Sequence, residues 1–131
     1  MAWQKIKIRP EQELVVGGYT RGTGTAVDLG ALLVGVYEDG ALRYAGKVGA
    51  GFTADIRTEL LAKVESLAAD ESPFATSPPR AAARNAIWLR PELVIRAEFA
   101  GWTGDGLVRQ AAYKGLDLGK DPRAVVREAP A

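Results

Sequence analysis

The sequence contains no cysteine and no histidine. Disulfide bonds, thiol chemistry, imidazole acid–base catalysis and the usual zinc ligand sets are therefore excluded. Long apolar segments are missing too: Gly30–Val36 falls far short of the roughly 20 residues that cross a bilayer, and we expect no membrane attachment. A strong excess of charge is also lacking. The net charge is +1, whereas domains that bind nucleic acid are commonly more basic.

What remains is the composition of one globular domain. The chain has 131 residues, of which 47% are hydrophobic and 25% charged, as in an ordinary single domain. Met1 is followed by Lys5 and Lys7 without an apolar segment, so we expect no secretory leader and a cytoplasmic location. Two carboxylates on one loop, Asp117 and Asp121, are too few to hold a hard metal ion, and we expect no metal site.

The first half of the chain carries strand patterns. Glu13–Tyr19 is a β-branched run interrupted by a glycine pair, and Leu29–Tyr37 is apolar enough to be a strand buried on both faces. Within it, Gly30 and Gly35 predict a bulge or a close backbone approach. Asp39 and Gly40 tolerate positive φ, so a hairpin turn is predicted before the partner strand Ala41–Val48.

The second half begins with a change of period. Apolar residues at helical spacing predict a helix over Thr53–Ala69, with Thr53 as its N-cap. Two more strands are predicted at Glu92–Phe99 and Leu107–Tyr113. A short C-terminal helix is predicted to start at Asp121, because Pro122 suits the first helical position.

This order of elements selects a fold class. Five or so antiparallel strands with one long helix between the third and the fourth fit a mainly β, five-stranded Greek-key barrel of the OB type. In such a barrel the helix covers one end. An SH3-like barrel fits less well because it lacks that helix.

Several motifs occur together in one order along the chain. W-Q-K-I-K at residues 3–7 resembles the WxKxK motif that closes the adenylation domain of ATP-dependent DNA ligases. E-L-V-V-G-G-Y at 13–19, G-K-V-G-A-G-F at 46–52 and F-A-G-W-T at 99–103 are similar to segments of the bacterial members. The likeness covers nearly the whole chain, and the combination resembles the C-terminal OB domain of a bacterial ATP-dependent DNA ligase of the end-joining and repair type.

The resemblance implies a function and an organisation. Residues 1–12 would be the end of the adenylation-domain motif and a linker, and residues 13–131 the OB domain. The domain would bind nicked duplex DNA at the nucleoid and supply cations to the ATP triphosphate during enzyme adenylation. Its partners would be an adenylation domain and DNA; ATP and Mg²⁺ would be bound through the adenylation domain and not by this chain alone.

The resemblance also implies catalytic residues. Four cations are expected to face the triphosphate: Lys5, Lys7, Arg109 and Lys120. Lys5 and Lys7 are two residues apart, so on a strand both would point to one side. The last motif of the family departs here, because Asp117 and Gly119 stand where the family has arginine and aspartate.

A second set of cations is expected to contact DNA. Its members are Lys47, Arg43, Arg84 and Lys114. Lys47 belongs to the glycine-rich segment Gly46–Gly51, which lacks the Gly-Lys-Ser/Thr ending of a P-loop. We therefore expect a turn whose glycines let the backbone approach DNA. Trp88 and Trp102 are expected to pack in the core rather than stack on bases.

Two other functions stay open on the sequence alone. No KxDG motif, which carries the adenylated lysine of these ligases, occurs in the chain. By itself the chain is therefore predicted to form no AMP adduct and to seal no nicks. A free-standing OB module for single-stranded nucleic acid is one alternative, and an interaction module or accessory subunit is another.

Overall fold

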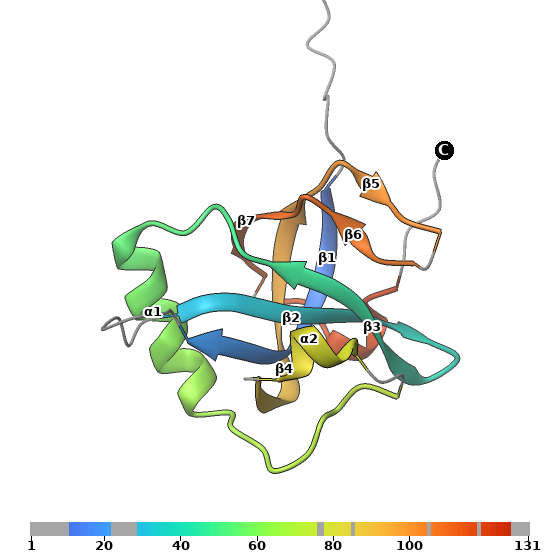
Figure 1. Cartoon of the computed structure of the whole chain (residues 1–131), viewed down its shortest axis with the longest axis horizontal. Coiled ribbons are helices and arrows are strands. Elements are labelled where there is room, and N and C mark those ends of the chain that lie inside the picture. Colours follow the sequence, from blue (N-terminus) through green and yellow to red (C-terminus); the bar gives the residue numbers. More distant parts are fainter. Residues whose placement is uncertain are drawn as a thin grey trace, which may run out of the picture.

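The computed structural model describes residues 11–21, 29–75, 78–84, 86–104, 106–117 and 119–126. Its main sheet has five strands in the order β3-β2-β1-β4-β7, and every neighbouring pair is antiparallel (Figure 1). The strands are β1 (Glu11–Arg21), β2 (Leu29–Glu38), β3 (Ala41–Val48), β4 (Ile87–Glu98) and β7 (Ala112–Leu116).

A short seam closes this sheet into a barrel. Ala50, just after β3, forms a parallel bridge with Ala112 at the start of β7. The Tyr113 amide donates a hydrogen bond of 2.8 Å to the Ala50 carbonyl across the same seam. Five antiparallel strands closed by a parallel contact between the third and the last, with a helix between the third and the fourth, confirm the predicted OB-type barrel.

The β2–β3 hairpin also confirms its prediction. Glu38 pairs with Ala41, which leaves Asp39 and Gly40 as the two turn residues. Their φ values are 54° and 84°, the positive values that this tight turn requires. In β2 the run Leu32–Val36 is buried throughout, as expected for a strand covered on both faces.

Helix α1 (Ala54–Glu65) is shorter than predicted. It begins where expected, because the Ile56 amide donates to the Thr53 hydroxyl at 3.2 Å. The prediction that it continues to Ala69 is wrong. The Ala69 amide instead donates to the Trp88 carbonyl at 2.8 Å, so this segment pairs with β4 and leaves the helix. A tertiary contact has overridden a helical period.

The segment after β4 differs more from its prediction. Leu107–Tyr113 is not one strand but is divided into β6 (Val108–Arg109) and β7, with Gln110 between them at φ 53°. Strand β6 pairs with β5 (Gly101–Trp102) in a separate two-stranded sheet, which lies at the end of the barrel away from α1 (Figure 1). A short helix that was not predicted, α2 (Arg80–Ala83), precedes β4.

The predicted C-terminal helix is a single 3-10 turn, η1 (Pro122–Ala124). It starts as expected, because the Asp121 carboxylate accepts a hydrogen bond of 3.0 Å from the Arg123 amide. It ends after one turn because Val125 is buried and its carbonyl accepts a 2.7 Å hydrogen bond from the Tyr37 amide on β2. The Gln12 amide group on β1 donates to the Val126 carbonyl at 2.8 Å. We call residues 125–126 the C-terminal strap.

Phe74 fills a space that two glycines leave open. A Cβ on Gly17 would lie 2.6 Å from the ring of Phe74, and one on Gly35 would lie 2.9 Å from it. The ring packs edge-on against Tyr44 at 5.4 Å and against Trp88 at 6.2 Å between centroids. The glycine pair in β1 and Gly35 in β2, where the register also shifts, are therefore packing positions.

The close approach of Gly51 to the Tyr113 backbone leads to a first prediction. The φ of Gly51 is +89°, and a Cβ would lie 2.6 Å from the Tyr113 carbonyl oxygen, so alanine would be strained and would push the seam apart. We expect Gly51→Ala to lower the free energy of unfolding by about 2 kcal/mol. Gly49→Ala is the matched control, because its Cβ would meet only the Ala31 methyl at 3.8 Å. Urea unfolding measures both, and equal stability of the two variants would contradict the role of the seam.

Candidate functional site

Two exposed lysines flank the seam. Lys47 is on β3 and Lys114 is on β7, and both residues are exposed. The bridge between Ala50 and Ala112 sets their spacing: Lys47 is three residues before it and Lys114 two residues after it. At about 3.3 Å per residue, the two Cα atoms are on the order of 15 Å apart along the strands.

The backbone between these lysines is accessible. Gly49, Ala50 and Gly51 are all exposed and have at most a methyl side chain. Another molecule can therefore approach this backbone closely, between two exposed cationic residues. Contacts between cationic side chains and phosphates do not depend on the base sequence, and their affinity falls as the salt concentration rises.

Arg109 is at the end of β6. The residue is exposed, it pairs with Gly101 of β5, and its carbonyl accepts a 2.8 Å hydrogen bond from the Ala100 amide. The β5–β6 hairpin, residues 101–109, therefore fixes the backbone that presents this guanidinium.

Lys120 is held by a carboxylate of the first strand. Its Nζ is 3.0 Å from Glu13 Oε1, and the two side chains are 32% and 24% exposed. Arg109 precedes β7 and Lys120 follows it, so they flank a five-residue strand that spans about 16 Å. The roles of Arg109 and Lys120 as triphosphate contacts stay predictions, and Glu13 would compete with a phosphate for the Lys120 ammonium group.

Arg43 contacts the protein itself. Its Nε is 3.8 Å from Glu38 Oε1, and its Nη1 donates to the Gly106 carbonyl at 3.4 Å. The side chain is only 28% exposed. Of the four predicted DNA contacts, this one is the most enclosed.

The remaining predicted cations lie elsewhere. Arg84 is exposed at the C-terminal end of α2. On β4, Arg90 pairs with Glu92 at 3.0 Å and Arg96 pairs with Glu11 of β1 at 3.2 Å. Exposed pairs of this kind contribute little to stability. Lys5 and Lys7 lie outside the described residues.

Trp88 and Trp102 pack against the core, as predicted. Trp88 contacts Phe74, and Trp102 packs edge-on against Phe99 at 5.3 Å. Burial raises the pKa of Tyr44. Burial, with the charge of Glu59 second, raises the pKa of Tyr113. Both phenols therefore stay neutral at physiological pH and act as core groups.

The described residues do not fit a metal site. They include no group of three or more acidic side chains that could hold a metal ion. Asp121, one of the two carboxylates weighed in the sequence, caps η1. In the part of the chain that the structure describes, no helix is long and apolar enough to cross a bilayer.

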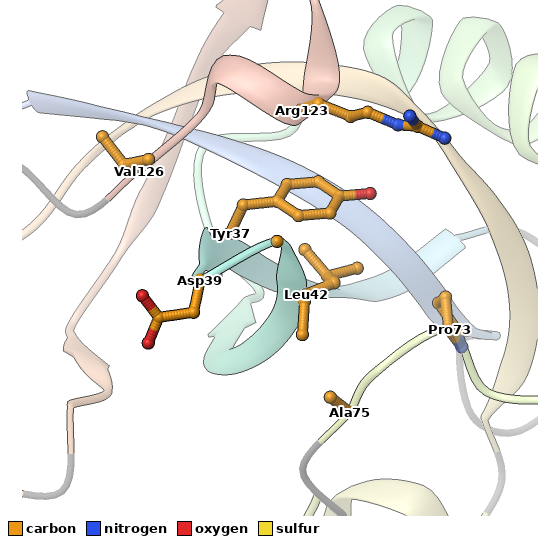
Figure 2. Close-up of a pocket in the computed structure, with 9 residues that line it drawn as sticks. Tyr37, Asp39, Leu42, Pro73, Ala75, Arg123 and Val126 are labelled. Atoms are coloured by element: carbon orange, nitrogen blue, oxygen red, sulfur yellow. The ribbon is translucent and has the colours of Figure 1, made fainter.

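One hollow is lined by described residues that do not include the seam lysines. It has a volume of about 570 Å³ and is lined by apolar and charged side chains around Tyr37 on the β2–β3 hairpin. Figure 2 shows the Tyr37 ring between Arg123 and Leu42, with Asp39 on the other side of the hairpin. None of the predicted site residues lines this hollow.

The closed five-stranded barrel and its helix define an OB-fold domain. The family described as the C-terminal region of ATP-dependent DNA ligases matches residues 25–118. The chain belongs to this family.

Two known proteins with similar sequences support this family assignment. The chain is 41% identical over 132 residues to the multifunctional non-homologous end joining protein LigD of Pseudomonas aeruginosa, and the match covers 98% of this chain and 16% of that protein. It is 38% identical over 128 residues to LigD of Mycolicibacterium smegmatis, with 97% and 17% covered. The chain thus spans only 16% and 17% of these relatives.

Solved structures agree as well. The crystal structure of the ligase domain from M. tuberculosis LigD matches with a TM-score of 0.88 and 36% identity, over 93% of this chain and 40% of that one. A mycobacterial DNA ligase D complexed with ATP and MES matches with a TM-score of 0.83 and 35% identity, over 93% and 39%.

Proposed function

We propose that this domain binds nicked duplex DNA as part of an ATP-dependent DNA ligase that acts in end-joining repair. The observation that carries the proposal is the exposed backbone of residues 49–51 between Lys47 and Lys114. Small residues between two cations suit a close, sequence-independent approach to a phosphate backbone. The names of the relatives support the repair context.

The same domain would serve an earlier step from another position. Arg109 and Lys120, with Lys5 and Lys7, would face the ATP triphosphate while AMP is transferred to the adenylation domain. Cations placed where phosphoryl charge develops lower the barrier to such a transfer. A mycobacterial DNA ligase D was complexed with ATP, which supports ATP as the nucleotide of this step.

Partners and location follow from these two roles. The adenylation domain would hold ATP, Mg²⁺ and the lysine that takes AMP, and DNA in the cytoplasm would be the second partner. A module for single-stranded nucleic acid would present exposed aromatic rings for stacking. Among the described residues the one large exposed hydrophobic side chain is Val126, so this alternative has less support.

The test joins residues 1–131 to an adenylation domain of the same family and measures sealing of nicked duplex DNA. We expect the joined protein to seal nicks and the adenylation domain alone to be at least tenfold slower. This chain alone should take up no label from radioactive ATP, because it has no KxDG motif. Equal sealing with and without residues 1–131 would contradict the proposal.

A further inference from the structure

Hydrogen bonds within the β5–β6 hairpin hold its two ends together. The Thr103 amide donates to the Leu107 carbonyl at 2.8 Å, and the Leu107 amide donates to the Thr103 hydroxyl at 3.1 Å. The Gly106 amide donates to the Thr103 carbonyl at 3.0 Å. Since these hydrogen bonds are all made within the loop, they do not fix the orientation of the hairpin on the barrel. That orientation depends on the contacts between the hairpin and the barrel.

Two contacts attach the hairpin to β3. In the first, Val108 of β6 lies over Gly46, where an added Cβ would be 3.1 Å from the valine Cγ2. In the second, the Arg43 guanidinium lies against the bare backbone of Gly106 and donates to its carbonyl at 3.4 Å. Gly106 has φ +80°, a conformation that L side chains rarely adopt, and an added Cβ would displace the guanidinium.

Arg43 is well suited to hold the hairpin and poorly suited to bind DNA. Its charge faces Glu38, and its side chain is 28% exposed. Lys47, on the same strand, is exposed. A planar guanidinium donates along fixed directions, whereas a lysine ammonium acts as a point charge on a flexible stem. Lysine at position 43 would therefore keep the charge and lose part of the fixed geometry.

We propose that Arg43 is a positioning residue that fixes the β5–β6 hairpin and thereby directs Arg109. Arg109 is the residue after Val108 and is paired with Gly101 in the same hairpin. This inference rests on the proposed function, in which Arg109 contacts the triphosphate. It moves Arg43 from the DNA-binding set, where the sequence placed it, to the adenylation step.

The experiment uses the full-length enzyme and compares Arg43→Met, Arg43→Lys, Arg109→Ala and the double variant Arg43→Met/Arg109→Ala. We expect Arg43→Met to slow self-adenylation about tenfold, Arg43→Lys to retain part of the rate, and the double variant to be no slower than Arg109→Ala. Effects that act through one group do not add. Sealing of DNA that already carries a 5′-AMP should be unchanged. Arg90→Met is the matched control, because it removes an exposed arginine that is paired with Glu92.

Amide hydrogen exchange measures directly whether Arg43 holds the hairpin in place. Loss of Arg43 should speed exchange at Thr103, Gly106 and Leu107 and leave the β1 amides unchanged. If Arg43→Met fails to fold, Arg43→Lys carries the same readouts. Suppose that Arg109→Ala leaves self-adenylation unchanged while loss of Arg43 speeds amide exchange in the hairpin. The proposed contact of Arg109 with the triphosphate is then wrong, and the role of Arg43 in positioning the hairpin is supported. Unchanged exchange, additive losses, or slower sealing of pre-adenylated DNA would overturn the inference.

Discussion

Replacing Arg109 with alanine is expected to slow self-adenylation about 100-fold while sealing of pre-adenylated DNA is retained. A cation on a developing phosphoryl charge contributes about 2–4 kcal/mol in comparable sites, which corresponds to roughly 30- to 1,000-fold in rate. The DNA-bound steps should be spared because another face of the domain would then be in use. Single-turnover assays of the full-length enzyme, with labelled ATP and with 5′-adenylated nicks, measure the two steps separately.

Lys120→Ala should act in the same direction with a smaller effect. Lys120 Nζ forms an ion pair with Glu13 Oε1 at 3.0 Å. Binding a triphosphate would weaken this ion pair, and its cost would offset part of the gain from the new contact. Asp117 reduces the positive field of the same segment further. Arg90→Ala is the control for loss of a surface charge. Equal losses in both steps, or none in either, would show that Arg109 and Lys120 do not face the triphosphate.

The double variant Lys47→Ala/Lys114→Ala should give the reverse pattern. We expect sealing of pre-adenylated nicks to slow about 10- to 100-fold, with self-adenylation unchanged. Each lost phosphate contact lowers the slope of log affinity against log salt by about 0.9, so the slope should fall by about 2. Titration of nicked duplex at several salt concentrations measures this slope.

A control for this variant removes the same charge from paired positions. Arg90→Ala/Arg96→Ala takes two cations from ion pairs on β4 and leaves Lys47 and Lys114 in place. If this control weakens DNA binding as much as the lysine variant, the DNA contact is on β4 and not at the seam.

The elements that follow from local chemistry were predictable from the sequence. Tolerance of positive φ at Asp39 and Gly40 placed the hairpin turn, and the Thr53 hydroxyl placed the start of α1. The errors arose where distant backbone groups meet. The helix ends before Ala69 because the Ala69 amide donates to the Trp88 carbonyl. Gln110 interrupts the predicted strand with a positive φ that glutamine rarely adopts, so nothing in the sequence indicated it.

The candidate site was predictable in part for the same reason. Lys47 in the glycine-rich segment Gly46–Gly51 was expected to contact a phosphate, and the structure places this lysine exposed on β3. The partners of Lys120 and Arg43 were missed, because Glu13 and Gly106 lie far from them in the sequence and on other elements. Only the register of the barrel brings such residues together.

The C-terminal strap has a mechanical consequence. Because Gln12 of β1 bonds to Val126 and Tyr37 of β2 bonds to Val125, two adjacent strands and the last described residues are joined at one corner of the barrel. A load that enters through β1 is therefore shared between its neighbours in the sheet and the strap, and no single row of hydrogen bonds carries it.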